Sequence, residues 1–131
     1  MTTRDLRNML DAAHSLEPAV RATGTLTGSG VDLLGYNAAA MLVYFGAYTN
    51  GTHTPSLEHS DDNVSFSAVS AAELEGSFAP VSSGAGVNSV QRVGYKGGKR
   101  YLRAVMTVAS GATGAASSAL ILRGQAGQEP V

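Results

Sequence analysis

The side chains of this 131-residue chain that could do chemistry gather around two histidines, His53 and His59, and the neighbouring pair Asp61 and Asp62. Imidazole and carboxylate groups are common metal ligands, so a metal site would be sought in this segment. A separation of six residues places both histidines on one face of an extended strand, but about 20 Å apart. The run from residue 60 to 63 also lacks the alternating oxygen ligands and distal glutamate of a calcium loop. We therefore expect no metal site, and we interpret the aspartates as part of a solvated Asx turn.

No motif assigns catalytic groups. Cysteine is absent, and so are the Gly-X-Ser-X-Gly elbow of hydrolases, the Walker loop and the dinucleotide-binding glycine pattern. Two carboxylate pairs, Glu58 with Asp61 and Glu73 with Glu75, have no feature that separates them from ordinary loop charges. We therefore predict that the chain is not an enzyme, has no catalytic residues and uses no cofactor.

Residues suited to contact with a partner are easier to find. Arg100, Tyr101 and Arg103 bring two guanidinium groups and a phenol together, and tyrosine and arginine are enriched among interface anchors. The same side chains could instead cover a neighbouring strand with their stems. Arg103 has Asp32 and Asp61 as candidate ion-pair partners. We take Arg100, Tyr101 and Arg103 as candidate partner-contact residues.

A second candidate contact surface is the N-terminal segment, residues 1–17. Leu6, Met9 and Leu10 recur at helical intervals, and Pro18 would end a helix that contains them. The segment is either a helix or an extended arm, and it packs on its own domain or docks on a neighbouring subunit. Termini are poorly ordered unless they are tied down, so a partner would explain the apolar residues. Leu6, Met9 and Leu10 are therefore further partner-contact candidates.

The elements that must position these residues are strands. Gly97-Gly98 can adopt the positive φ of a tight turn, which predicts a long antiparallel hairpin of residues 89–95 and 99–109. The second strand is expected to be central in a sheet. Strict alternation turns Arg100 inward unless the turn re-aims it. The core face of that strand is expected to carry Leu102, Ala104, Met106 and Val108.

Composition and turn spacing predict the fold class. Only 15% of residues are charged, glycine occurs 16 times, and about eight short strands are separated by turn signals. Residues 38–48 are apolar on both faces, which predicts a buried central strand. We predict an all-β, jelly-roll-like antiparallel β-sandwich. Its domain spans residues 18–125, after the N-terminal arm or helix of residues 1–17 and before a C-terminal tail of residues 126–131.

Charge and hydropathy exclude several classes of partner. The formal net charge of −1 argues against nucleic-acid binding, which usually needs a basic patch. No signal-peptide pattern is present, and the longest apolar run is far too short to span a membrane, so we expect a soluble protein without a membrane partner. A surface with few charges also suits a chain that is covered by neighbouring subunits.

Three segments together resemble small virion proteins of tailed bacteriophages: residues 30–36, residues 60–62 before an alternating strand, and residues 94–103. The class that they resemble most is the capsid decoration, or cement, proteins with a jelly-roll-like sandwich, and the likeness spans residues 18–125. The resemblance implies a structural protein on the capsid exterior, assembled in the bacterial host cytoplasm. Its implied partners are the major capsid protein, whose subunit contacts it reinforces, and itself, as a dimer or trimer.

Two alternatives to a decoration protein remain open from the sequence. The chain could be another virion part, a head-tail joining or tail-tube protein. It could also be a glycan-binding β-sandwich, which would need an outward aromatic platform from Tyr36, Tyr44 or Tyr48.

Overall fold

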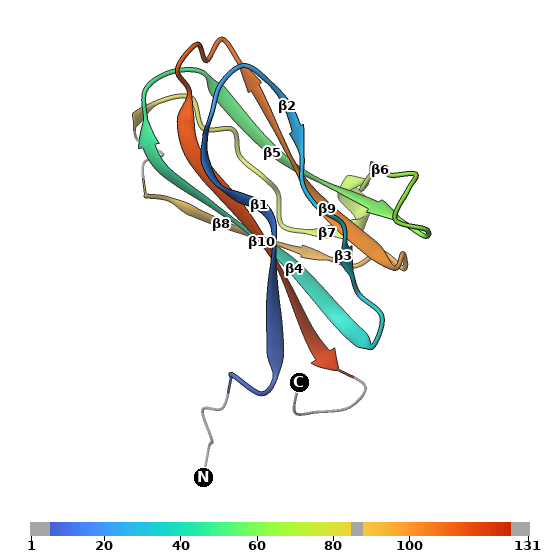
Figure 1. Cartoon of the computed structure of the whole chain (residues 1–131). Coiled ribbons are helices and arrows are strands. Elements are labelled where there is room, and N and C mark those ends of the chain that lie inside the picture. The colour runs from blue at the N-terminus through green and yellow to red at the C-terminus, as the bar shows by residue number, and fades with distance from the viewer. Residues whose placement is uncertain (1–5, 85–87, 127–131) are drawn as a thin grey trace.

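The computed structural model describes residues 6–84 and 88–126, and within them the regular structure is almost entirely β-strand (Figure 1). A short 3-10 turn, η1 (Ala71–Glu73), is an exception to this. Five strands form sheet A, in the spatial order β1 (Leu10–Arg21), β10 (Ala115–Ala126), β4 (Tyr36–Tyr48), β8 (Val90–Tyr95) and β7 (Leu74–Glu75). Sheet B has the order β2 (Gly24–Thr27), β9 (Tyr101–Ala109), β5 (Thr52–Ser60) and β6 (Ser67–Ala68), and β3 (Val31–Asp32) pairs with the start of β9.

The strand pairing is that of a jelly roll. With β3 and β7 set aside, eight strands remain, and the first pairs with the last, β1 with β10. Continuing inward, β2 pairs with β9, β4 with β8, and β5 with β6, all antiparallel. This is one long hairpin rolled into two facing sheets. The predicted all-β, jelly-roll-like antiparallel sandwich is confirmed.

The core lies between the two sheets and follows the period-two alternation of their strands. Sheet B contributes the four predicted residues of β9, which are all at most 3% exposed: Leu102, Ala104, Met106 and Val108. Sheet A contributes the inward side chains of β4 and β10, chiefly Met41, Val43, Phe45, Ala119 and Ile121. Both β9 and β4 are internal strands of their sheets, as the alternation and the apolar run predicted.

The predicted hairpin of residues 89–95 and 99–109 is wrong. β8 pairs with β4 and β7 in sheet A, whereas β9 pairs with β5, β2 and β3 in sheet B, so residues 96–100 cross between the sheets. Both strands have an apolar face, with Val93 buried on β8 and Leu102 buried on β9. Placed in opposite sheets, these faces cover each other across the core, and this long-range burial outweighs the local turn signal of Gly97-Gly98.

The N-terminal helix is also wrong for the part of the segment that forms β1. The strand begins at Leu10, inside the predicted arm, and pairs with β10 from Leu10 opposite Gly124. It continues past Pro18, where the register shifts between Leu16 and Ala19, as an edge strand that contains proline is expected to do. So short a helix is marginal on its own, whereas an edge strand gains the hydrogen bonds of a long partner. Residues 1–5, and 127–131 of the predicted tail, lie outside the described ranges.

Candidate interaction surface

Most of the predicted contact residues lie toward one end of the sandwich. Leu10 at the start of β1 lies in register with Gly124 of β10, which lies opposite Ala38 near the start of β4. The connection of residues 96–100 reaches the same end, where it lines a cavity together with residues 33–39. We call this the Arg100 end, made of residues 6–10, 32–38, 60–66 and 96–100. The opposite end of the sandwich contains the connection from β9 to β10 and is visible in Figure 1.

Arg100 does not turn into the core. Its side chain is 45% exposed, and its Nε and Nη2 donate to the two carboxylate oxygens of Asp32, each over 2.8 Å. The guanidinium also lies 5.0 Å from the centre of the Tyr101 ring. The hydrogen bonds from Arg100 are the main reason why the pKa of Asp32 falls to about 2, with help from the backbone N–H of Leu34. The same contact raises the pKa of Arg100.

A second arginine extends this ion pair across the end of the molecule. Arg123 of β10 donates from Nη1 to the backbone oxygen of Asp32 over 2.8 Å, and its Nη2 pairs with Asp11 of β1. Its guanidinium lies 4.8 Å from the centre of the Tyr36 ring. Strands β1, β10 and β3 are thus connected to the crossing connection of residues 96–100 through four charged residues, Asp11, Arg123, Asp32 and Arg100. Neither Arg123 nor Asp11 carries a local sequence signal, because 112 residues separate them.

Arg103 takes a different role from Arg100. It lies on the outer face of sheet B, opposite Glu58 in the register, and its Nε donates to Glu58 Oε1 over 2.7 Å. Both side chains are only 24% exposed, and the guanidinium lies 4.0 Å from the centre of the Phe66 ring. The predicted ion-pair partners of Arg103 are therefore wrong, because Asp32 pairs with Arg100 and Asp61 pairs with Lys99. Arg103 mainly covers the neighbouring strand β5 with its stem, which is the alternative to partner contact that the sequence left open.

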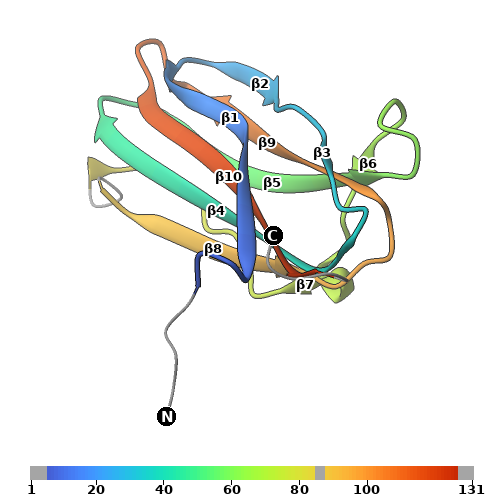
Figure 2. The same ribbon diagram turned by 60° about the horizontal axis from the view of Figure 1, so that its bottom comes forward.

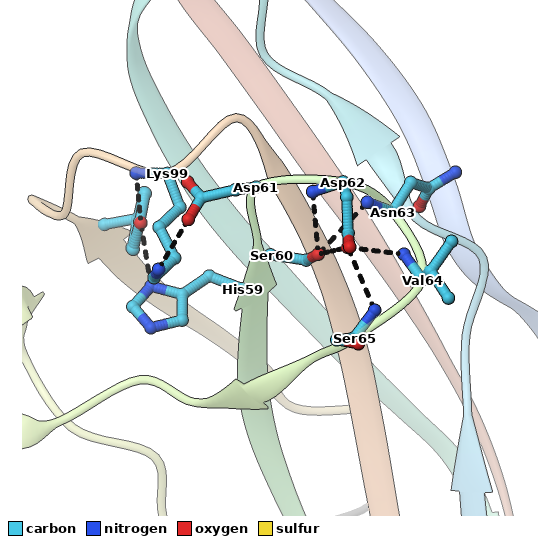
Figure 3. Close-up of polar contacts among 9 residues, drawn as sticks. His59, Ser60, Asp61, Asp62, Asn63, Val64, Ser65 and Lys99 are labelled. Atoms are coloured by element: carbon cyan, nitrogen blue, oxygen red, sulfur yellow. Dashed lines mark hydrogen bonds and ion pairs between the residues drawn. The ribbon is translucent and has the colours of Figure 1, made fainter.

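The polar turn after β5 is preorganised by its own side chains (Figure 3). The carboxylate of Asp62 accepts hydrogen bonds from the backbone N–H groups of Ser65 and Val64 and from the hydroxyl of Ser60, over 2.8 to 3.0 Å. Ser60 Oγ in turn accepts from the backbone N–H groups of Asp62 and Asn63. These bonds, led by that from Ser65, lower the pKa of Asp62 to about 2. The predicted Asx turn is confirmed.

The histidine nearest this turn bonds across the core to the opposite sheet. His59 is buried, and its Nδ1 lies 2.9 Å from the hydroxyl oxygen of Tyr95 on β8. That oxygen also accepts the backbone N–H of Lys99, while Lys99 Nζ pairs with Asp61 over 2.9 Å (Figure 3). Burial raises the pKa of the Tyr95 phenol. The network joins β5, β8 and the crossing connection, and so fixes the position of residues 96–100.

His53 is separate from this network. It is fully buried, its Nε2 lies 3.0 Å from the backbone oxygen of Asn50, and its ring packs edge-on against Phe45 and Tyr48. Among the residues that the structure describes, no group of three or more His, Cys, Asp or Glu side chains is arranged to hold a metal ion. The two histidines are therefore placed as core side chains with polar partners.

The cavity at the Arg100 end has a volume of about 400 Å³. It lies between residues 33–39 and 95–100, and its lining combines apolar side chains, glycine backbone and the two neighbouring cations Lys99 and Arg100. This volume is within the range of sites that hold a small molecule or one inserted side chain. Its rim carries Leu34, which is 68% exposed.

Apolar side chains are exposed at several places around the Arg100 end. Leu6 is 63% exposed and Met9 is 52% exposed, in the segment before β1. Leu34 in the β3–β4 connection is 68% exposed, and Val64 in the Asp62 turn is 80% exposed. Leu10, the third predicted contact residue of the N-terminal segment, is only half-buried at the start of β1. The end thus combines fixed ion pairs with projecting apolar side chains.

The fold is similar to part of a solved structure, the PBSX exported protein XepA. The likeness has a TM-score of 0.54 and 22% sequence identity, and covers 92% of this chain and 39% of XepA. The chain therefore spans about two fifths of the length of that protein. No family model matches the chain, and no curated protein matches its sequence. In the described ranges, no helix is long and apolar enough to cross a membrane.

Proposed function

We propose that this chain is a structural virion protein that binds the outer surface of a phage capsid and reinforces contacts between major capsid subunits. The observation that carries the proposal is the Arg100 end, where exposed Leu6, Met9, Leu34 and Val64 surround loops fixed by ion pairs. Exposed apolar groups among polar side chains are typical of protein interaction sites. The likeness in fold to XepA, a protein of phage PBSX, supports a phage context.

The rigidity of the Arg100 end favours binding without chemistry. Arg100, Asp32 and Arg123 hold the β3–β4 connection, and Asp62 holds the next turn, before any partner arrives. A surface that is already ordered loses little conformational entropy on binding, which improves affinity for a given contact area. On a shell with many equivalent sites, weak single contacts add when copies are linked. The proposed role needs no reaction and no cofactor.

The test is binding to purified capsid shells that lack the protein. We expect saturable binding of the wild-type chain, together with greater resistance of the shells to heat. Leu34→Asp is expected to weaken binding at least about tenfold, because it places a carboxylate in a contact that excludes water. Ala112→Asp is the matched control, since it adds the same charge to an exposed loop at the opposite end. Equal binding by both variants, or no saturable binding by the wild type, contradicts the proposal.

The alternatives predict different locations and ligands. A head-tail joining or tail-tube protein would form rings and occupy one vertex or the tail, which electron microscopy of labelled particles distinguishes from an even distribution over the shell. The glycan-binding alternative needs an open aromatic platform. One face of Tyr36 is occupied by Arg123, and the Tyr48 ring packs on His53 while its hydroxyl donates to the backbone oxygen of Gly51. These contacts take two of the three candidate tyrosines out of an open platform, and Tyr44, which is partly exposed, would have to supply it without them.

A further inference from the structure

The two outer faces of the sandwich differ in polarity. An antiparallel sheet with one side in water normally alternates apolar residues inward with polar residues outward. Sheet B follows this rule: its outer face carries Thr54 opposite Thr107 and the ion pair of Glu58 and Arg103. Sheet A departs from it, because the outward side chains of β4 and β10 are mainly apolar, like their inward ones. The central outward side chains of these two strands are Ala38, Ala40, Leu42, Tyr44, Ser118, Leu120 and Leu122, of which Tyr44 and Ser118 carry a hydroxyl group.

The register joins these side chains into a continuous apolar surface. Their inward neighbours are the core residues of β4 and β10, so they must point away from sheet B. One row across β1, β10, β4 and β8 consists of His14, Leu120, Leu42 and Arg92. The next row consists of Ala12, Leu122, Ala40 and Gly94. The two central strands contribute no charge to either row, and ionisable groups stand only at the margins.

No second sheet or helix in the described part of the chain packs on this surface. Sheet B lies on one side of sheet A only, and Figures 1 and 2 show β1, β10, β4 and β8 side by side with their other side open. Leu42, Tyr44, Leu120 and Leu122 are partly shielded and remain partly exposed. Beside them, Val90 of β8 is 61% exposed.

We propose that the outer face of sheet A binds a second copy of this chain. The four strands have 12, 12, 13 and 6 residues. At about 4.8 Å between strands and about 3.4 Å per residue, the face measures on the order of 700 Å². An interface of standard size buries about 600–1,000 Å² per partner, so the area of this face lies in the lower part of that range. This inference rests on a different surface from the Arg100 end and does not depend on capsid binding.

The uncharged centre is the reason to choose a second copy as the partner. In a contact between identical surfaces, residues near the symmetry axis meet their own equivalents, so a charge there would meet a like charge. The central leucines and alanines avoid this repulsion, and two such sheets pack at about 10 Å with interdigitated side chains. The polar outer face of sheet B has no comparable set and is expected to stay in water.

The experiment compares Leu120→Lys with Thr107→Lys by sedimentation equilibrium over concentrations up to about 100 µM. Both variants place a lysine on a long internal strand, one on each outer face. We expect the wild type and Thr107→Lys to self-associate equally. Leu120→Lys is expected to weaken association at least about 100-fold, because symmetry removes two leucines from one interface. Circular dichroism and thermal melting identify a variant that has not folded.

A second measurement does not require a disruptive substitution. The chain has no cysteine, so Ala40→Cys and Thr54→Cys each introduce one thiol, on the outer face of sheet A or sheet B. A short bis-maleimide is expected to join two copies of Ala40→Cys and to leave Thr54→Cys uncoupled. A monomeric wild type, undiminished association of folded Leu120→Lys, or equal coupling of both cysteine variants overturns the proposal. A monomeric chain whose shell binding is lost in Leu120→Lys also overturns it, and assigns the face to the shell.

Discussion

Replacing Ser15 by alanine tests a hydrogen bond that links the two sheets beside the edge strand β1. Ser15 lies on β1 and is buried, and its Oγ accepts the backbone N–H of Ala104 on β9 over 2.8 Å. The same hydroxyl donates to the backbone oxygen of Ser29 over 2.7 Å. The backbone of Ser15 adds a third contact, because its oxygen accepts the N–H of Ser29. One small side chain therefore links an edge of sheet A to the central strand of sheet B.

The cost of the substitution follows from the groups left without partners. Ala104 is fully buried, so its N–H finds no water when the hydroxyl is removed, and an unsatisfied buried donor costs about 1–3 kcal/mol. The carbonyl of Ser29 is in an exposed residue and can bond to water, so it adds little. We take about 2 kcal/mol as the expected loss. For 131 residues at about 2.1 cal/mol/K each, the unfolding entropy is about 0.28 kcal/mol/K, and Tm should fall by about 7 °C.

The assay is thermal unfolding followed by circular dichroism at neutral pH. Ser29→Ala is the matched control. It removes a hydroxyl from the connection between β2 and β3 but keeps the backbone groups of residue 29 that Ser15 contacts. We expect the control to melt within about 2 °C of the wild type, as exposed substitutions usually do. A fall in Tm of less than about 2 °C for Ser15→Ala would refute the reasoning that this hydroxyl is needed to satisfy a buried donor.

Three further predictions concern the Arg100 end and the opposite loops. Tyr95→Phe removes the hydroxyl oxygen that bonds to both His59 and the backbone N–H of residue 99. It should lower the free energy of unfolding, measured by urea titration, by about 1–2 kcal/mol at an unchanged m-value. An unchanged urea midpoint would contradict this prediction. The pKa values of Asp32 and Asp62 are about 2 in the folded chain, against an ordinary value of 3.8, so these groups add stability above pH 4 that is lost as the pH falls toward 2. Thermal melts from pH 5 to 2 should show this loss as a fall in Tm with falling pH, and the fall should be smaller for Asp32→Asn and Asp62→Asn. An equal fall in Tm for the wild type and both variants would exclude these carboxylates as the source of the lost stability. Gly114→Ala, at φ +90°, would place a Cβ against the backbone oxygen of Arg21, and should abolish soluble expression that a wild-type control retains.

Local patterns predicted the parts of the structure that depend on one segment at a time. The alternation of residues 102–108 identified a core-facing strand, because side chains in any strand alternate between faces whatever its neighbours are. The Asx turn at Asp62 was predictable for the same reason, since its hydrogen bonds reach only three residues along the chain. The N-terminal segment shows the limit of such patterns. Leu6, Met9 and Leu10 have helical spacing, but Leu10 begins a strand because β10 supplies a hydrogen-bonding partner.

The sequence alone determined that this chain forms an antiparallel β-sandwich, because strand periodicity and turn residues act locally. Only the tertiary structure decided which strands pair, and so put residues 96–100 across the two sheets instead of in a hairpin. It also decided that Arg100 pairs with Asp32 over 68 residues and that Arg103 pairs with Glu58 over 45. Such contacts are selected by burying two apolar faces against each other, and this depends on the whole chain at once. The same folding step left the outer leucines of sheet A without a second sheet or helix packed on them in the described chain, a property of the assembled sheet that no single segment contains.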